Sequence, residues 1–507
     1  MSDHIYDVIV AGAGPVGLFL AGELAQEHLS VLVLEREAEP DSPWKTFPLG
    51  LRGLDPSSLE SMDRRGLLPK LLDAQVQLPA RKSGFAGHFA GIMVGLEKFD
   101  LSRWKYRLPG PSLKTIPTST IQLETILADR AESFGAKILR GNEVAHITET
   151  DGIVTVSVVS GDVFQSRWLV GCDGGRSAVR KAAGFEFNGT EPKYTGYSIV
   201  GDFDTPEPLP MGFQRTEKGF FITVPPNLVH LIDFDTVGFD RKQDPSLEHM
   251  QEVMSRVTGN SALKINRMDH IFSSTDRCRQ ASTYRKGRIL LAGDAAHIHS
   301  PLGAQGLNLG LGDAMNLGWK LAAMIRQEQS ESSTTLDWKI IDSYEQERYP
   351  VARWCLEWTR AQVATLFPDI YASSIRNLVS QLINTKDGTN LLIGHIWGLS
   401  RQYDLGALHE LVGASSPDFE FTDGERLGPA LKCGKGLLLD FKGEPELSNL
   451  QNKFADRVKY LNKTPKESCG LQALLIRPDG IVAWASDHSQ VLDSAAVMQV
   501  MQKWFSF

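Results

Sequence analysis

The sequence has little of several features that mark whole classes of protein. It holds five cysteines in 507 residues and no Cys-x-x-Cys pair, so neither a disulfide framework nor a zinc site is expected. No apolar run approaches the roughly 18 residues of a membrane-spanning helix, and no basic stretch leads into an apolar one at the start. A net charge of −8 argues against general binding to nucleic acid or anionic membranes. These absences predict a globular protein of a reducing, cytoplasmic compartment.

A glycine-rich loop near the start of the chain predicts a site for a phosphate-bearing cofactor. Residues 5–11 are typical of a buried strand, residues 12–17 read Gly-Ala-Gly-Pro-Val-Gly, and a helical pattern follows. Gly12 permits a tight turn, Gly14 lets a pyrophosphate approach the backbone, and Gly17 brings helix and strand together. A glycine turn that binds nothing is the alternative, but the strand and helix around this one argue against it.

Three further segments extend the site and predict that the cofactor is FAD. The apolar strand 31–34 is followed by Glu35, whose carboxylate can accept hydrogen bonds from an adenosine ribose. Residues 172–176 read Cys-Asp-Gly-Gly-Arg, and residues 293–297 read Gly-Asp-Ala-Ala-His after a buried strand. In this order, the motifs favour a flavin-dependent hydroxylase over a nicotinamide dehydrogenase.

The segment after the third motif carries features suited to the flavin itself. Asp294, at a strand's carboxyl end, can bind the ribityl hydroxyls. Pro301 and Gly303 stiffen and thin a loop that must touch the flavin ring. A helix is predicted from about residue 304, and free N–H groups in its first turn can stabilise negative charge on reduced flavin; these are the N–H groups of Gly306, Leu307 and Asn308.

Small residues recur every fourth position in that helix. Gly306, Gly310, Ala314 and Gly318 form the stripe, and a glycine inside a helix costs about 1 kcal/mol relative to alanine. The stripe therefore predicts very close packing against the dinucleotide-binding core.

The segment 293–320, taken with the glycine loop and Asp173-Gly174, resembles the single-component FAD-dependent aromatic hydroxylases, the group of p-hydroxybenzoate hydroxylase. The segment 476–484, Ile-Arg-Pro-Asp-Gly-Ile-Val-Ala-Trp, is similar to the subset with a C-terminal thioredoxin-like domain, which includes phenol hydroxylase, rifampicin monooxygenase and aromatic polyketide hydroxylases. The resemblance covers nearly the whole chain and is weakest between residues 185 and 280. Three departures from the pattern could alter packing near the flavin: Ala304, Leu309 and Gly312.

The resemblance implies a set of FAD contacts. They are Gly12, Gly14, Val16, Gly17, Glu35, Arg36, Arg52, Gln122, Val144, Asp173, Asp294, Pro301, Gly306, Leu307 and Asn308. Arg52 is the candidate for a phosphate or flavin-side arginine, with Lys45 as its rival, and Arg176 joins Asp173 in a motif that serves both FAD and NAD(P)H. The catalytic side chains stay unassigned, with Pro301 and Gly303 as flavin-loop candidates.

The activity that the resemblance implies is monooxygenation. NAD(P)H would reduce FAD, O2 would add at flavin C4a as a hydroperoxide, and the distal oxygen would pass to a phenolic or polyketide-like aromatic small molecule of secondary metabolism. Baeyer–Villiger insertion or epoxidation, a flavin dehydrogenase without a peroxide, and a flavin-binding protein without turnover remain alternatives. The sequence leaves NADPH against NADH, and a possible homodimer, undecided.

The predicted fold is α/β with three parts. Residues 1–74, 119–185 and 281–400 are expected to form a discontinuous FAD domain of the p-hydroxybenzoate hydroxylase type, with a Rossmann-type βαβ unit and a helical end. Residues 75–118 and 186–280 are expected to form an inserted β-sheet substrate domain, and residues 410–507 a thioredoxin-like domain.

Local patterns add expectations about single elements. The Gln-, Ser-, Glu- and Thr-rich segment 325–343 is expected to be a surface loop, residues 447–458 and 494–505 to be helices, and the Pro-Asp-Gly at 478–480 to be a hairpin turn.

The sequence does not support a metal-binding, redox or substrate-binding role for several polar side chains. His297 and His299 have no carboxylate partner in their loop and make a poor metal site, so a structural hydrogen bond is expected for His297. Cys433 and Cys469 lack the spacing of a redox pair. Nothing in the sequence distinguishes Gln214, Arg215 and His230 from ordinary residues of the predicted substrate sheet.

Overall fold

A mostly parallel sheet organises the cofactor-binding part of the chain. The computed structural model describes residues 4–77, 84–207, 209–235, 245–330, 336–407 and 409–506. The strands run in the order β18-β19-β10-β1-β2-β7, and β19, β10, β1, β2 and β7 are parallel. β9 also pairs with β10, and β8 pairs with β9. Their bounds are β1 (Ile5–Ala11), β2 (Val31–Glu35), β7 (Lys137–Arg140), β8 (Val144–Thr150), β9 (Ile153–Val158), β10 (Val163–Gly171), β18 (Arg285–Lys286) and β19 (Ile289–Leu291).

Helix α1 (Pro15–Gln26) follows β1 and packs against the long helix α7 (Gln305–Gln329). A Cβ atom at Gly310 would lie 2.6 Å from Val16, and one at Gly318 would lie 2.5 Å from Glu23. The small-residue stripe therefore lets the two helices approach closely, as its spacing predicted.

Smaller elements of this part complete the layer around the sheet. They are β3 (Leu51–Leu54), α2 (Pro56–Asp63), α3 (Leu68–Asp73), β6 (Ile116–Ser119), α4 (Thr120–Ser133), α5 (Ala178–Ala182), η2 (Gly293–Ala295) and β20 (His297–Ile298).

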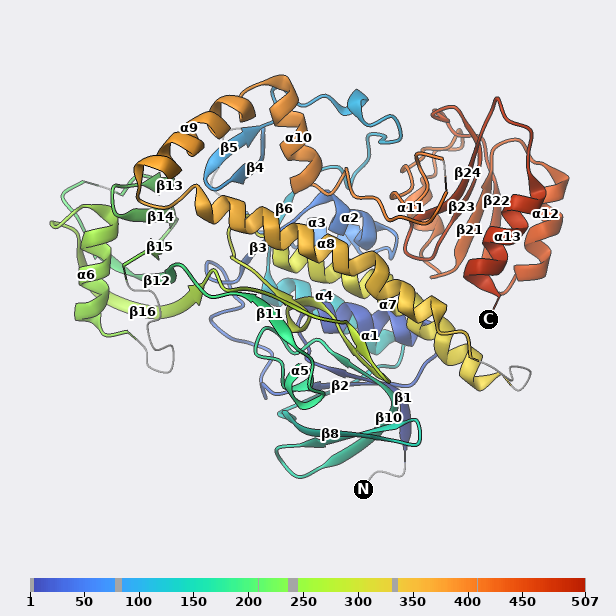
Figure 1. Cartoon of the computed structure of the whole chain (residues 1–507), viewed down its shortest axis with the longest axis horizontal. Helices are drawn as coiled ribbons and strands as arrows, with labels where there is room; N and C mark the ends of the chain where they lie inside the picture. Colours follow the sequence, from blue (N-terminus) through green and yellow to red (C-terminus); the bar gives the residue numbers. More distant parts are fainter. Residues whose placement is uncertain are drawn as a thin grey trace.

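Helix α8 (Lys339–Ala364) runs beside α7 through the middle of the molecule (Figure 1). The prediction of a loop over 325–343 is wrong at both ends, because α7 continues to Gln329 and α8 starts at Lys339. Residues 331–335 lie outside the described residues. Ile325, Ile340 and Ile341 on the two helix ends are buried.

A second sheet, inserted into the first part, has the strand order β13-β14-β15-β12-β16. Its strands are β12 (Thr195–Asp204), β13 (Gly212–Arg215), β14 (Gly219–Val224), β15 (Leu228–Asp233) and β16 (Lys264–Thr275). The open sheet predicted over 194–235 is confirmed for these residues, and the structure adds β16 and the helix α6 (Leu247–Thr258) that covers one face. The strand that leads into this sheet, β11 (Phe187–Thr190), pairs with the strand that leads out of it, β17 (Cys278–Ala281), so the chain enters and leaves the insertion at one place.

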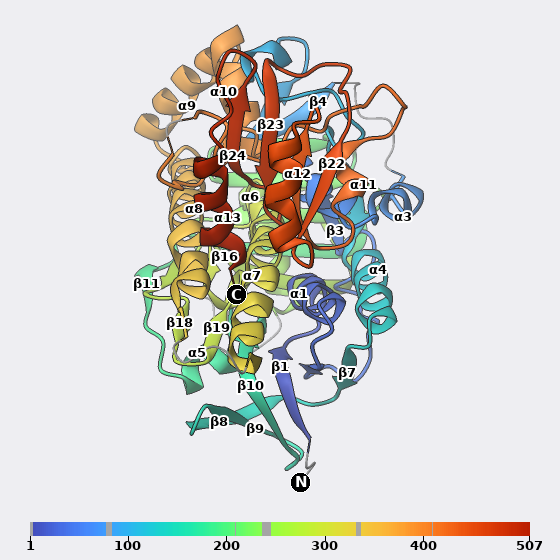
Figure 2. The same cartoon turned by 90° about the vertical axis from the view of Figure 1, so that its right-hand side faces the viewer.

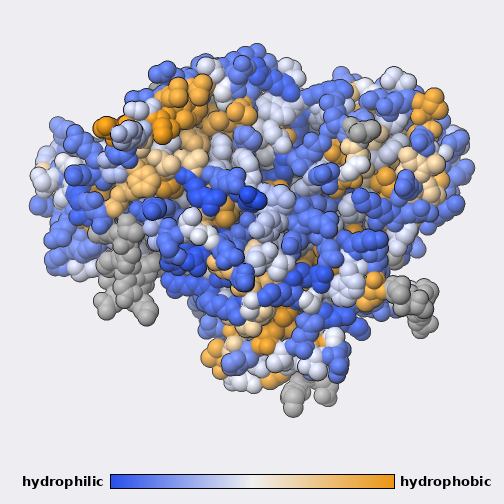
Figure 3. Space-filling view, in the orientation of Figure 1, coloured by the Kyte–Doolittle hydropathy of each residue, from blue (hydrophilic) through white to orange (hydrophobic). Residues whose placement is uncertain are grey.

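Above this sheet lie α9 (Ile370–Ile383), α10 (Lys386–Ile396) and the hairpin of β4 (Phe85–Phe89) and β5 (Ile92–Gly95). Helix α9 exposes apolar side chains, among them Ile370 at 75%, Tyr371 at 77% and Leu378 at 57% of their surface. Figure 3 shows an apolar patch at the upper left, where α9 lies in the same view in Figure 1.

The C-terminal sheet has the strand order β22-β21-β23-β24. Its elements are α11 (Leu427–Ala430), β21 (Gly436–Asp440), α12 (Pro445–Gln451), η3 (Asn452–Phe454), β22 (Val458–Asn462), β23 (Leu471–Ile476), β24 (Val482–Asp487) and α13 (Ser494–Phe505). α12 and α13 lie in front of the sheet in Figure 2. The hairpin turn at 478–480 and the helix over 494–505 are confirmed.

The helix predicted over 447–458 is too long. Helix α12 ends at Gln451, and Val458 already begins β22, which pairs in parallel with β21. Residues 458–462 form a strand because they pair with β21, and Val458 is buried at its start. In the described parts of the chain no helix has the length and apolarity needed to cross a membrane.

Candidate flavin site

The carboxyl edge of the parallel sheet brings the three sequence motifs together. Ala11, the last residue of β1, is in register with Gly171 of β10, and Gly171 with Leu291 of β19. The glycine loop, the Cys172-Asp173 turn and the Gly293-Asp294 turn therefore leave the sheet side by side. Ligands of doubly wound sheets bind at this edge.

The glycine loop fits a pyrophosphate. Gly12 has φ +105°, and a Cβ atom there would lie 2.5 Å from the Cys172 carbonyl oxygen, whereas one at Gly17 would lie 2.0 Å from the Gly12 oxygen. Nothing lies within 4 Å of the position a Cβ would take at Gly14, and no side chain caps α1 there. The loop thus leaves the first N–H groups of α1 open to an anion.

Glu35 supports the loop from the neighbouring strand. Its Oε2 accepts a hydrogen bond from Ala13 N–H at 2.7 Å, and its Oε1 accepts one from Glu37 N–H at 3.0 Å. A carboxylate can accept further bonds at each oxygen, so these contacts orient Glu35 without using up its capacity for a ribose. Arg36 is exposed and pairs with Glu37.

Asp294 faces the start of α7 from the η2 turn. The position a Cβ would take at Gly306 lies 3.8 Å from Asp294 Oδ1, and the Asp294 side chain is exposed. Burial lowers the pKa of Arg52, and the charges of Asp294 and Glu124 offset part of that shift. Lys45 instead donates to Glu124 at 2.8 Å. Arg52 itself donates from Nη1 to Leu49 O at 3.1 Å and to Leu51 O at 2.7 Å, and its contact with FAD stays a prediction.

Helix α7 begins one residue later than predicted. Ala304 is its N-cap, in the left-handed region with φ +52° and without a side-chain cap. The N–H groups of Gln305, Gly306 and Leu307 are the ones that lack an intrahelical acceptor by position. Asn308 acts through its side chain, which donates to Gly53 O at 3.0 Å and accepts from Ser58 Oγ at 2.7 Å. Its predicted contact with FAD stays a prediction.

The flavin loop, residues 293–304, joins this edge to the inserted sheet. Ser300 Oγ lies 2.8 Å from the Tyr194 hydroxyl oxygen, and Leu302 is buried in an aromatic cluster with Phe89 and Phe220. Pro301 is exposed, and Gly303 has φ +88°. The two loop residues singled out from the sequence thus flank Leu302, which packs in this cluster.

Two buried groups near the motifs were missed from the sequence. Arg180 donates to Ala295 O and Gly175 O, both at 2.9 Å, and so connects the two Asp-Gly turns. Asp313 accepts from the Gly293 N–H at 3.0 Å and from His297 Nε2–H at 2.7 Å. The only signal in the sequence was a charged residue at an otherwise apolar helix position. His297 therefore does have a carboxylate partner, supplied by α7 rather than by its own loop.

Other predicted contacts lie at the edges of the site. Asp173 Oδ2 accepts from Ala178 N–H at 2.6 Å and caps α5, while its Oδ1 is buried and unpartnered. Gln122 closes the capping box of α4, and Val144 begins β8. Arg176 is exposed. Within the described residues, no group of His, Cys, Asp and Glu side chains is placed to hold a metal ion.

Comparison with known proteins identifies the family of the chain. The family described as FAD binding domain matches residues 5–359, and that described as Aromatic-ring hydroxylase, C-terminal matches residues 409–506. A Claviceps purpurea protein named as a monooxygenase is 46% identical over 96% of both chains, and rifampicin monooxygenase of Streptomyces venezuelae is 34% identical over 99% of both. The structure of an anhydrotetracycline hydroxylase from Streptomyces rimosus has a TM-score of 0.86 at 32% identity and covers 99% of this chain and 100% of its own.

The chain belongs to the FAD-dependent aromatic-ring hydroxylases. It is a flavoprotein monooxygenase whose cofactor is FAD and whose co-substrate is NAD(P)H. The fold expected from the resemblance, an FAD domain of the p-hydroxybenzoate hydroxylase type with an inserted sheet and a C-terminal α/β part, is confirmed.

Proposed function

We propose that the protein uses NAD(P)H and O2 to hydroxylate a polycyclic phenol bound between the flavin loop and the inner face of the inserted sheet. The names of the relatives, which act on rifampicin and anhydrotetracycline, support a large aromatic substrate. The observation that carries the proposal is a row of side chains across that face.

The row follows from the strand register. Residues paired across β13, β14, β15, β12 and β16 are, in order, Phe213, Ile222, His230, Ser198 and Phe272. Paired residues of adjacent strands share a face, and α6 covers the opposite one. A flat, apolar and aromatic row with one polar pair at its centre suits a fused-ring phenol.

His230 gives the row its polar centre. Its Nδ1 lies 2.7 Å from Ser198 Oγ. Burial, and after it the positive charge of Arg52, lower the pKa of His230 to about 4, so the imidazole is neutral at physiological pH. A neutral imidazole can orient a phenolic hydroxyl through a hydrogen bond without adding a buried charge.

The cofactor site divides its tasks among the residues at the sheet edge. Bound FAD supplies the reduction by NAD(P)H and the activation of oxygen. Gly14 and the start of α1 hold its phosphates, Glu35 its adenosine ribose and Asp294 its ribityl chain. The first turn of α7, beginning at Gln305, stabilises negative charge at the flavin ring.

The Asp294 assignment is tested by FAD affinity. Asp294→Ala leaves ribityl hydroxyls without an acceptor and should weaken FAD binding by roughly 1–3 kcal/mol, about 5- to 150-fold. The matched control is Asp129→Ala, which removes an exposed carboxylate on α4. Wild-type affinity in Asp294→Ala, measured by titrating the apoprotein with FAD, would refute the assignment.

The substrate proposal is tested by kinetics. NAD(P)H oxidation should be slow alone and much faster with a polycyclic phenol from a panel that also holds ketones and alkenes. His230→Ala should then raise KM at least tenfold with unchanged FAD content. Gln214→Ala is the control, because Gln214 pairs with Phe221 on the opposite face of the sheet, and its amide donates to Met211 O. A ketone or alkene as the preferred substrate, or an unchanged KM in His230→Ala, contradicts the proposal.

The proposal also covers the domain division, the oligomeric state and the cellular location. The domain division predicted from the sequence is supported by the β11–β17 pair, which lies at the boundaries near residues 186 and 280. A homodimer through the exposed apolar side of α9 is supported by its patch, and Leu378→Asp should shift the protein to monomer in analytical ultracentrifugation. A reducing, cytoplasmic location is supported by five unpaired cysteines.

A further inference from the structure

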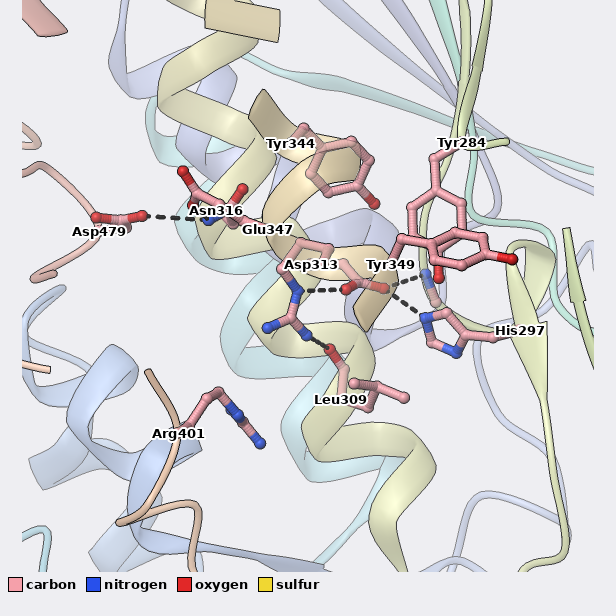
Figure 4. Close-up of polar contacts among 12 residues, drawn as sticks. Tyr284, His297, Leu309, Asp313, Asn316, Tyr344, Glu347, Tyr349, Arg401 and Asp479 are labelled. Carbon is pink, nitrogen blue, oxygen red and sulfur yellow. Dashed lines mark hydrogen bonds and ion pairs between the residues drawn. The ribbon is translucent and has the colours of Figure 1, made fainter. Parts of the chain in front are cut away.

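Asp313 occupies an unusual position for an ionised side chain. It lies in the middle of α7 with none of its surface exposed, yet it accepts hydrogen bonds from three groups (Figure 4). Oδ1 accepts from Arg348 Nε–H of α8 at 2.7 Å. Oδ2 accepts from Gly293 N–H at 3.0 Å and from His297 Nε2–H at 2.7 Å.

Two of these donors, Gly293 and His297, flank Asp294, the residue proposed to bind the ribityl chain of FAD. One carboxylate therefore fixes both ends of the turn that presents Asp294. Gly293 has φ +62°, a left-handed conformation that the bond from its N–H helps to hold. The Asp294 side chain itself is exposed toward the start of α7.

Arg348 of α8 stabilises the negative charge on Asp313. Burial alone would raise the pKa of Asp313, but the charges of Arg348 and His297 outweigh it and lower the pKa to about 2. Arg348 is itself held by the Leu309 carbonyl at 2.8 Å and the Tyr403 hydroxyl at 2.9 Å. Because the carboxylate can only accept, His297 carries its proton on Nε2.

We propose that Asp313 is the positioning residue of the flavin loop: its carboxylate, anchored to α8 by Arg348, holds Gly293 and His297 and thereby aims Asp294 at the ribityl chain of FAD. This inference rests on the role of Asp294 in the proposed function. Asp313 does not touch the cofactor, so its effect must pass through the turn.

A buried ion pair that only stabilises the fold would behave differently. Glu347 offers the comparison, since it is also buried and accepts two bonds from Arg477 at 2.8 Å and one from Asn316 at 2.7 Å. None of these partners belongs to the flavin loop. Glu347→Gln therefore disturbs a buried ionic group of similar make-up without touching the turn.

The test compares Asp313→Asn with Glu347→Gln. In Asp313→Asn an amide N–H faces one of the former donors, so the turn loses part of its anchor. For both variants and the wild type, FAD affinity, the visible circular dichroism of bound FAD and the thermal midpoint are measured. We expect both midpoints to fall, but only Asp313→Asn to weaken FAD at least tenfold and to change the dichroism. Equal FAD effects in the two variants, or wild-type affinity and dichroism in Asp313→Asn, overturn the proposal.

A second pair of variants decides the matter if Asp313→Asn does not fold. His297→Leu removes one donor of the turn, and His297→Gln returns an amide N–H near the position of Nε2. We expect His297→Leu to weaken FAD at least tenfold and His297→Gln to stay within threefold of wild type. Indistinguishable FAD affinities in the two variants overturn the proposal. The proposed function is judged separately on wild-type turnover, so a wild type that binds FAD but hydroxylates no phenol fails there and leaves this comparison intact.

Discussion

The side chain of Arg477 connects the C-terminal part of the chain to the FAD-binding part. It is fully buried, donates two hydrogen bonds of 2.8 Å to Glu347 of α8, and lies over the rings of Trp319 and Trp504. Lys320 Nζ also contacts Glu347 at 2.9 Å. The buried group comprises Arg477 and Lys320 facing Glu347 and Asp479, and burial lowers the pKa of Lys320 to about 7.

Arg477→Met leaves this group with an uncompensated negative charge. Loss of the charged hydrogen bonds to both Glu347 and Asp479, partly offset by the apolar packing of Met, should cost about 3–5 kcal/mol of unfolding free energy. Urea unfolding followed by tryptophan fluorescence measures it, because Trp319 and Trp504 flank the site.

A control and a double variant make the measurement specific. Arg353→Met breaks an exposed pair with Glu357 on the same helix and should change the free energy by less than about 0.5 kcal/mol. Arg477→Met/Glu347→Gln should lose at least about 1 kcal/mol less than the sum of the two single variants, since the side chains are in contact. A loss below about 1 kcal/mol in Arg477→Met, or full additivity in the double variant, would refute the reasoning.

Three further predictions address other regions. Burial and then the charge of Asp418 raise the pKa of Asp63 from 3.8 to about 6. The protonated carboxyl therefore stabilises the folded state fully below pH 3.8, and this contribution is lost as the pH rises through about 6. Asp63→Asn should therefore gain about 1–2 kcal/mol at pH 7.5 relative to pH 4 in urea melts, and an equal effect at both pH values counts against this. Gly310→Val should cost about 1–3 kcal/mol through overpacking against α1 and lower the FAD content of purified protein; wild-type stability and FAD content would contradict the helix contact. Cys433→Ser/Cys469→Ser should keep nearly full hydroxylation, since both thiols are unpaired, whereas loss of turnover with FAD still bound would assign them redox work.

The sequence predicted the features that depend on local backbone geometry. A side chain at Gly12 or Gly17 would collide with the neighbouring backbone, so only glycine fits at these positions, and their spacing is visible in the sequence. Glu35 and Asp294 were found because each lies at the carboxyl end of a strand of the parallel sheet, Glu35 as the last residue of β2 and Asp294 in the turn after β19. The stripe that includes Gly310 was found because its period equals one helical turn.

The features that depend on contacts between distant segments were not predictable. Asp313 and Arg348 lie on different helices, and nothing local indicates that they meet at the flavin loop. His230 is distinguished only by the register of the inserted sheet and by the nearby charge of Arg52. The strand β22 was concealed because its pairing with β21, rather than its own short pattern, determines its conformation.

The central claim, that the FAD site activates oxygen for transfer to a phenol, is tested most directly by isotope labelling. The holoenzyme, NAD(P)H and the phenol that best stimulates NAD(P)H oxidation are incubated under 18O2, and the product is analysed by mass spectrometry. The account predicts a hydroxylated product carrying a single 18O atom for each NAD(P)H consumed. A product whose new oxygen comes from water, or release of stoichiometric hydrogen peroxide without a labelled product, would contradict it.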